Sequence, residues 1–560
     1  MKTVRRLTVL VLVMVLVLPT FAGVTSAQGD GKSLVTAYGV GDPHSIDPQL
    51  GIDQRDMTLI TQLFPGLTWQ NEESRDVELA MASSYDVSED GKTYTFHLLE
   101  QVPWVRYNAD SGEVEALTDD SGAPRYVTAA DFVFGWTRAL DPVTAAPGAY
   151  MMAPYITGAA EFNAGEGSAD ALGLKAVDDY TFEVTAPEAV GYVLGIYGLG
   201  TARPVPAWAI EESGDVWTEP ENIATYGPFA LKEWSHDESI TFVKNPFWPG
   251  SEGIGQANVD ELTIRFMDES VQLREFEAGG MDVIYAPATD LDRIRADSTL
   301  SSELSIVPDL CSQAWGFNTE KPPFDNVHIR RAFSYAVDRQ SLIDFVTKGG
   351  EIPARWFTPP SISLAPTLED NPDLGIAFDP EMAQQELALG LADLGLESAD
   401  DLPAITVVFG NTELLSATAQ ALQVMWEEAL GIRVELSALD TTTYWSTLEE
   451  DAGQIYRAGW CPDYNDANNY LRDVMRSDSL YNYGHWNSPE FDQIVDEARL
   501  LTDPEQRREL YAQAEQLMVV DEAALMPLYW PITAMLTQPD VTRTYATTHI
   551  EAYWKWDLNQ

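Results

Sequence analysis

The chain predicts an α/β fold with a partly parallel sheet, because strand patterns and helix patterns alternate along its length. Ile405–Phe409 is a continuous apolar run typical of a buried strand, and Ile432–Leu436 is a second one. Between them we expect a helix over 417–430, capped by Ser416 and ended by Gly431. A strand, a helix and a strand in this order form a βαβ unit, whose two strands are parallel.

Residues typical of helix starts and of turns predict further helices and strands. Asp379 and Asp503 each precede a proline, so each is expected to cap a helix that begins at that proline. Alternating residues over 94–98 and 180–184 follow turn signals and predict half-buried strands. No shift in composition marks a domain boundary. Domains assembled from separate pieces of chain are expected to show no such shift.

The N-terminus predicts export. Basic residues at positions 2, 5 and 6 precede an apolar stretch, and small residues precede position 28, so residues 1–27 are predicted to be a signal peptide. An uncleaved N-terminal anchor is the alternative. No cysteine lies near the cleavage region, so no lipid anchor is expected. The mature protein is expected in the periplasm or at the extracytoplasmic face of the membrane.

The formal net charge of −55, from 88 acidic and 33 basic residues, excludes some partners. Such a surface repels nucleic acid and anionic membranes, so neither is expected to bind. The acids are spread along the chain, which indicates a strongly solvated exterior. The two cysteines, Cys311 and Cys461, predict one disulfide in an exported chain, with two buried free thiols as the alternative.

Motifs of common enzymes are absent from the sequence. There is no G-x-S-x-G elbow, H-E-x-x-H helix or P-loop. The six histidines never lie within five residues of one another, so a local zinc site is not expected. Pairs of acids imitate a glycosidase dyad, but 88 acids produce such pairs by chance. We therefore identify no candidate catalytic residue in the sequence and expect no cofactor.

One run, Arg457–Asp466, combines a cation, a cysteine, aromatic rings and acids within ten residues. Arg457 and Asp463 flank Trp460, and Gly459 permits the close approach of another backbone. An acid and a base beside an aromatic wall suit a zwitterion, such as the two ends of a peptide. The alternative is a structural ion pair between Arg457 and Asp463.

A series of segments gives this run a context. In chain order they are Ser45–Pro48, Leu63–Leu67, Ser88–Leu98, Val127–Phe132, Trp136–Pro142, Tyr226–Phe229, Lys244–Trp248, Phe317–Thr319, Lys321–Asp325, Ala336–Arg339 and Arg457–Tyr464. Together they resemble the extracytoplasmic solute-binding proteins of peptide ABC transporters, solute-binding protein family 5, and most closely the oligopeptide-binding type. The resemblance covers nearly the whole mature chain.

The resemblance implies a two-lobed α/β periplasmic-binding-protein fold of type II, in its large three-domain variant, with discontinuous domains and a hinge. The expected segments are 28–76, 201–310 and 529–560 for lobe I, 77–200 for a smaller domain packed on lobe I, and 311–528 for lobe II. Lobe II is expected to close over a ligand in the cleft.

The resemblance also implies roles for particular residues. Asp463 corresponds to the acid that holds a peptide's α-ammonium group, and Arg457 to a base that meets some C-terminal carboxylates. Gly459, Trp460 and Cys461 are similar to the strand that pairs with the ligand backbone, a form of β-augmentation.

The resemblance further places the loop of Ile52, Asp53 and Gln54 opposite the ligand and pairs Cys311 with Cys461. The sequence departs from the family at other pocket positions. A pocket tryptophan falls near Thr441, with Trp445 close by, and a pocket tyrosine falls at Gly148, with Tyr150 close by. Leu448 stands where a second basic residue is expected.

These implications predict the substrate-binding component of an ABC importer. It is expected to capture oligopeptides as a monomer and to deliver them to permease subunits in the membrane. One alternative is the same fold carrying an oligosaccharide or a metal chelate. A secreted hydrolase is the alternative from another class.

Overall fold

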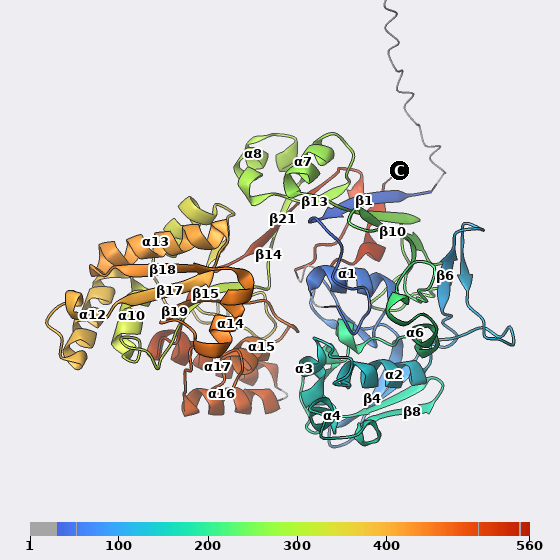
Figure 1. Cartoon of the computed structure of the whole chain (residues 1–560), viewed down its shortest axis with the longest axis horizontal. Coiled ribbons are helices and arrows are strands. Elements are labelled where there is room, and N and C mark those ends of the chain that lie inside the picture. Colours follow the sequence, from blue (N-terminus) through green and yellow to red (C-terminus); the bar gives the residue numbers. More distant parts are fainter. Residues whose placement is uncertain (1–30, 52, 502, 548–549, 560) are drawn as a thin grey trace, which may run out of the picture. The chain divides into compact units, whose positions relative to one another are not determined.

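Three large sheets organise the part of the chain that the computed structural model describes, residues 31–51, 53–501, 503–547 and 550–559 (Figure 1). Residues Lys32–Gln560 form one compact unit. The predicted signal peptide and Ile52 lie outside the described residues. In the described ranges, no helix is long and apolar enough to cross a membrane.

The first sheet has seven strands drawn from distant parts of the chain. In spatial order they are β10 (Phe229–Ser235), β11 (Ser239–Lys244), β12 (Glu261–Phe266), β1 (Ser33–Tyr38), β13 (Val283–Tyr285), β21 (Ile532–Thr537) and β14 (Leu304–Pro308). β1 is parallel to β12, while β21 is antiparallel to β13 and β14. Side chains from α7 (Glu269–Glu277) and α8 (Leu291–Ala296) share a core with Ile284 and Leu536.

The second sheet has four strands and confirms both alternating patterns. Its order is β4 (Ala82–Val87), β5 (Thr93–Leu98), β9 (Thr181–Thr185) and β8 (Leu174–Asp178). On β9, Phe182 is buried and packs against Phe132 and Trp136 of α2 (Ala129–Leu140), with ring centroids 5.5 and 5.1 Å away. The polar residues that alternate with Phe182 face outward, as the period of two requires.

Shorter elements surround these two sheets. They are α1 (Gln54–Leu63), β2 (Thr68–Gln70), β3 (Val77–Leu79), β6 (Val105–Asn108), β7 (Glu113–Ala116), α3 (Ala149–Met152), α4 (Ala159–Asn163), α5 (Val193–Ile196), α6 (Ala207–Ser213), α9 (Leu300–Glu303), β22 (Val541–Thr542) and β23 (Asp557–Leu558). Short 3₁₀ turns connect several of them, including one at Gly200–Ala202.

The third sheet contains the predicted βαβ unit. Its order is β16 (Ile352–Pro353), β20 (Leu525–Trp530), β15 (Ser312–Phe317), β19 (Ile455–Trp460), β17 (Ile405–Gly410) and β18 (Val434–Leu439). β17 and β18 are parallel, as predicted, and α13 (Glu413–Leu430) connects them.

The predicted start of this connecting helix is wrong. Thr412 is the N-cap residue, and its side chain accepts a hydrogen bond from the Leu415 amide at 3.2 Å, so the helix begins four residues before the predicted start at 417. Threonine is a common N-cap residue, although serine ranks above it, and the acidic Glu413 in the first turn is stabilised by the positive end of the helix dipole. The predicted end is confirmed, because Gly431 adopts the left-handed conformation with φ 73°.

Helices cover both faces of the third sheet (Figure 1). Trp315 on β15 packs with α10 (Val327–Tyr335), α12 (Pro380–Leu394) and α13, whereas the preceding residue, Ala314, packs with α15 (Ala467–Met475), α16 (Pro489–Leu500) and α17 (Pro504–Glu515). Neighbouring strand residues point to opposite faces, so the buried run 314–317 of β15 fits a sheet covered on both sides. α11 (Arg339–Leu342) and α14 (Thr441–Asp451) complete the region.

Both predicted aspartate caps are confirmed. The Asp379 side chain accepts from the Met382 amide at 2.9 Å, and Asp503 accepts from the Glu505 and Gln506 amides at 3.0 Å. In each case the proline occupies the first helical position, where a backbone N–H would have no hydrogen-bond acceptor within the helix.

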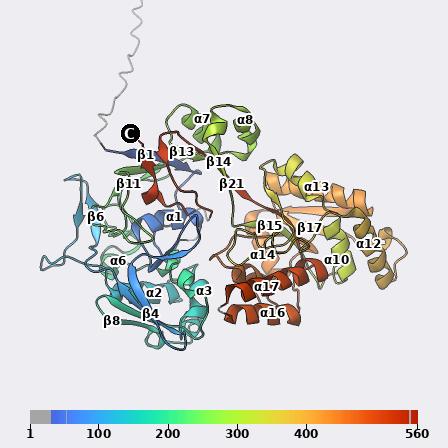
Figure 2. The ribbon, with the colours of Figure 1, turned by 180° about the vertical axis from the view of Figure 1, so that it is seen from behind.

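The chain crosses between the first and third sheets at two places, visible from both sides of the molecule (Figures 1 and 2). Residues 308–312 lead from β14 to β15, and residues 530–532 lead from β20 back to β21. The Asp309 amide donates to the Pro531 carbonyl at 3.1 Å, so the two crossings run side by side. We call residues 308–312 and 530–532 the hinge crossings, because a two-lobed fold of the predicted kind would bend where the chain passes between these sheets. The predicted domain boundaries stay a prediction.

Candidate ligand-binding site

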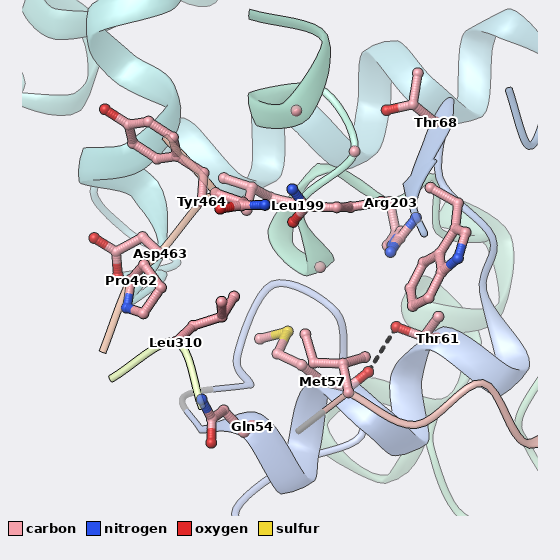
Figure 3. A pocket seen from close by; sticks show the side chains of 17 residues that line it. Gln54, Met57, Thr61, Thr68, Leu199, Arg203, Leu310, Pro462, Asp463 and Tyr464 are labelled. Carbon is pink, nitrogen blue, oxygen red and sulfur yellow. Dashed lines mark hydrogen bonds between the residues drawn. The ribbon is translucent and has the colours of Figure 1, made fainter. Parts of the chain in front are cut away.

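A pocket of about 820 Å³ lies where α1, the segment 195–203 and the loop after β19 meet (Figure 3). We call it the central pocket. Its lining includes Gln54, Met57, Thr61, Thr68, Leu199, Arg203, Leu310, Pro462, Asp463 and Tyr464. Residues separated by several hundred positions in sequence therefore share one cavity, and Leu310 brings a hinge residue into the same wall.

Asp463 is the one acid in the lining of this pocket among the described residues. Its carboxylate accepts hydrogen bonds from the Tyr150 hydroxyl at 2.9 Å and from the Asn469 side-chain amide at 3.1 Å. No described lysine, arginine or histidine forms an ion pair with it. Burial raises the pKa of Asp463 above its ordinary value, and the two neutral donors oppose this effect.

Asn469 on α15 holds the turn that presents Asp463. Its buried side-chain oxygen accepts from the Trp460 indole at 2.8 Å and from the Asp463 amide at 3.0 Å. Its nitrogen donates to the Asp463 carboxylate and, at 3.3 Å, to Asp473. Asp473 is half-buried, and the loss of water around its carboxyl group raises its pKa to about 6. One amide thus fixes the direction of both the Trp460 ring and the Asp463 carboxylate.

Aromatic side chains close the space beside Asp463. The Tyr192 ring stacks on Tyr464, with centroids 5.2 Å apart and an interplanar angle of 10°. The guanidinium of Arg507 lies 5.4 Å from the Tyr192 ring and pairs with Asp466 at 2.7 Å. Tyr192 follows strand β9 of the four-stranded sheet, and Tyr464 follows strand β19 of the six-stranded sheet. These contacts therefore join two distant parts of the chain.

Arg457 lies in a second cavity of about 600 Å³, which we call the aromatic pocket. Its lining includes Trp445, Leu448, Tyr456, Trp460, Tyr481 and Tyr483. Arg457 donates to Gln313 at 3.0 Å and has no carboxylate partner among the described residues. The two charges of the 457–466 run therefore line different cavities and do not pair with each other, which excludes the structural ion pair.

The strand edge at Gly459 and Trp460 is partly open. β19 pairs with β15 along its whole length, but with β17 only at Ile455 and Tyr456. Beyond these residues no described strand pairs with its second edge. Side chains do reach the strand: the Tyr444 hydroxyl donates to the Arg457 carbonyl, and the Tyr470 hydroxyl donates to the Trp460 carbonyl at 3.1 Å. An edge with free N–H and C=O groups is what β-augmentation needs.

The structure contains the predicted disulfide between Cys311 and Cys461. Because β15 and β19 are antiparallel with Ser312 opposite Trp460, the residues just beyond this pair meet, and their Cα atoms are 4.1 Å apart. The disulfide therefore attaches the Pro462–Asp463 turn to the first hinge crossing.

The predicted loop 52–54 contributes unequally. Gln54 lines the central pocket. Asp53 caps α1 by accepting from the Asp56 amide at 2.9 Å, and Ile52 lies outside the described residues. Arg203, Tyr192 and the hydroxyl of Tyr150 are site features that the sequence did not assign. The departure at Gly148, with Tyr150 close by, was the available signal for the last of these.

Comparison with known proteins identifies the class that this fold and site define. The family model of bacterial extracellular solute-binding proteins, family 5 Middle, matches residues 76–482. The chain therefore belongs to this family of non-enzymatic solute-binding components of ABC importers.

Two curated relatives illustrate the range of the family. The chain is 33% identical over 503 residues to the probable deoxycholate-binding periplasmic protein YgiS of Escherichia coli, covering 89% of this chain and 88% of the relative. It is 32% identical over 546 residues to the oligopeptide-binding protein OppA of Bacillus subtilis, covering 95% of this chain and 94% of the relative.

Solved structures share the fold. The unliganded open form of the periplasmic murein tripeptide binding protein MppA matches with a TM-score of 0.75 at 24% identity, covering 95% of this chain and 98% of that one. The Haemophilus influenzae OppA complex with RPPGFSPFR matches with a TM-score of 0.71 at 25% identity, covering 95% of this chain and all of that one.

Proposed function

We propose that this protein captures oligopeptides between its lobes and delivers them to the permease of an ABC importer. The observation that supports this most is Asp463, a half-buried carboxylate in the central pocket whose described partners are neutral. A peptide's α-ammonium group supplies both the missing charge and the missing hydrogen-bond donors. The open edge at Gly459 and Trp460 can then pair with the peptide backbone irrespective of its side chains.

Lobe closure would bury the peptide and present one shape to the permease, with the protein acting as an exported monomer. Several relatives are periplasmic oligopeptide-binding proteins, which supports this placement. The signal-like residues 1–27 support export independently.

A second candidate is a bulky apolar solute with an anionic end. The aromatic pocket and its unpaired Arg457 would suit such a molecule, and relatives are named for deoxycholate and for haem. Leu448 adds to the apolar character of this pocket.

A ligand panel decides between the two. The purified protein is first examined by native mass spectrometry for carried cargo. Calorimetry then compares short free peptides, their N-acetylated forms, deoxycholate and haemin. Peptide capture predicts binding of the free peptides and strong weakening on acetylation. Binding of deoxycholate or haemin without binding of any peptide would replace the proposal with the second candidate.

We expect the affinity for free-amine peptides to fall as the pH is lowered. A proton competes with the ligand ammonium for Asp463, and burial lets this competition begin at a higher pH than for an ordinary carboxyl group. The affinity is therefore largest at neutral pH, where Asp463 is ionised and the amine is still protonated. Calorimetry between about pH 4 and pH 7 measures the slope.

The matched control is the N-acetylated form of the same peptide. Its weaker binding does not depend on the charge of Asp463, so its affinity is expected to change less than that of the free-amine peptide over the same range. Titration of Asp473 would alter both curves, because Asn469 connects it to the same turn. Parallel slopes for the two peptides would contradict the role of Asp463.

A further inference from the structure

Arg203 is a cation without a partner in the wall of the central pocket. The residue is 2% exposed and follows the 3₁₀ turn at Gly200–Ala202. The Gln49 side chain donates to its backbone carbonyl at 3.1 Å. Its guanidinium, in contrast, forms no hydrogen bond or ion pair with any described residue, and Nε and Nη1 are buried without an acceptor.

Other buried arginines of the chain, unlike Arg203, have hydrogen-bond or ion-pair partners for their guanidinium groups. Arg330 and Arg339 donate to backbone carbonyls, and Arg507 pairs with Asp466. The sequence offers 88 acidic residues for 33 basic ones, so acids are plentiful. An unpaired buried charge is costly, and such groups in a folded protein are normally paired. The absence of any described partner therefore indicates an acceptor that comes from outside the chain.

The surrounding backbone leaves room for this side chain. A Cβ atom at Gly66 would lie 1.9 Å from Arg203 Nη1, so only glycine at position 66 permits the present placement. Burial lowers the pKa of Arg203 to about 10, and the group is still protonated at neutral pH. The pocket thus contains a fixed, charged, fork-shaped donor.

The position of Arg203 suggests what it binds. In Figure 3 it lies on the side of Thr61 and Thr68, whereas Asp463 lies on the other side of the same pocket. A cavity with an unpaired cation at one wall and an unpaired carboxylate at another complements a zwitterion. We propose that Arg203 receives a carboxylate of the bound peptide while Asp463 holds its amine.

This inference rests on the proposed peptide capture and makes it more specific. Nε and Nη1 of Arg203 are buried, so a ligand carboxylate reaches the guanidinium through Nη2, in a charge-assisted hydrogen bond. Arg457, the cation implied by the family resemblance, lies in the aromatic pocket instead. The protein should therefore favour short peptides whose two free ends both reach the central pocket.

The test compares alanine peptides of two to five residues, each as the free acid and as the C-terminal amide, by calorimetry. For the best-fitting length we expect the amide to bind about 10- to 100-fold more weakly than the acid. In Arg203→Met the two forms should bind with nearly equal affinity. The control Arg433→Met, which removes an exposed arginine paired with Glu427, should keep the wild-type difference.

A second variant tests the same contact without removing the charge. Gly66→Ala places a methyl group against Nη1 and should displace the guanidinium, so it too should reduce the difference between acid and amide. Circular dichroism and thermal unfolding establish that each variant is folded. The comparison of the free acid with the amide in the wild type tests the contact even if a variant does not fold.

The outcomes separate this inference from the peptide proposal. If N-acetylation weakens binding by the wild type but amidation does not, the role of Arg203 is overturned and peptide capture stands. If Arg457→Met abolishes the difference and Arg203→Met retains it, the carboxylate is received in the aromatic pocket and the inference is again overturned. Failure of the wild type to bind any of these peptides overturns both.

Discussion

Asp463→Asn is expected to weaken the binding of a free-amine peptide by about 3 kcal/mol, or roughly 100-fold. The substitution preserves the size of the side chain and one acceptor for Tyr150 or Asn469. It removes the negative charge, so the ligand ammonium would be buried without a counter-ion. The loss should appear in calorimetry as a lower affinity, and in kinetics chiefly as faster dissociation.

Two controls make this result specific. The N-acetylated peptide brings no ammonium, so its affinity for the wild type and for Asp463→Asn should be similar. Asp400→Asn removes an exposed acid from the turn at Ala399–Asp401 and should leave both affinities unchanged. An equal loss for the free and acetylated peptides would show that Asp463 shapes the turn and does not bind the amine.

Removal of the disulfide, by Cys311→Ala together with Cys461→Ala, is expected to lower the free energy of unfolding by up to about 5 kcal/mol. The bond connects residues 150 positions apart, so it strongly restricts the unfolded chain. In the folded state it attaches the Asp463 turn to the hinge crossing. Urea unfolding of the wild type, with and without a reductant, and of the double variant measures the effect.

The reduced wild type and the double variant should unfold at the same lower urea concentration. A reductant should have no further effect on the double variant, because no other cysteine is present in the sequence. Unchanged unfolding midpoints would mean that the β15–β19 pairing alone holds the two segments together. Peptide affinity should also fall in the folded double variant, since the turn that carries Asp463 becomes less constrained.

Local signals in the sequence predicted much of the fold. Asp379 and Asp503 are caps whose partners lie two or three residues away, and Gly431 ends its helix through its own backbone conformation. Such features depend little on the rest of the chain. The predicted start of α13 was wrong because Thr412 and Ser416 are both capping residues four positions apart, and the intrinsic capping preference favours Ser416.

The site was predicted only in part, because its remaining properties are tertiary. The resemblance identified Asp463 and Arg457 as one binding unit, but neighbouring positions on a strand and turn can face different cavities. Nothing local distinguishes Arg203 from a surface arginine. Its position in the mainly apolar and glycine-containing stretch 193–206 was the available signal, while its burial and lack of a partner follow from contacts with Gly66, remote in sequence.

The disulfide between the first hinge crossing and the Asp463 turn also has a mechanical consequence. In a molecule that closes by rotation, a point near the axis travels a short arc and a point far from it travels a long one. Leu310 and Cys311 belong to the crossing, and Cys461 is bonded to it, so the amine anchor sits on a short lever arm. Asp463 would therefore move little during closure, and a peptide amine would meet it while the lobes are still apart.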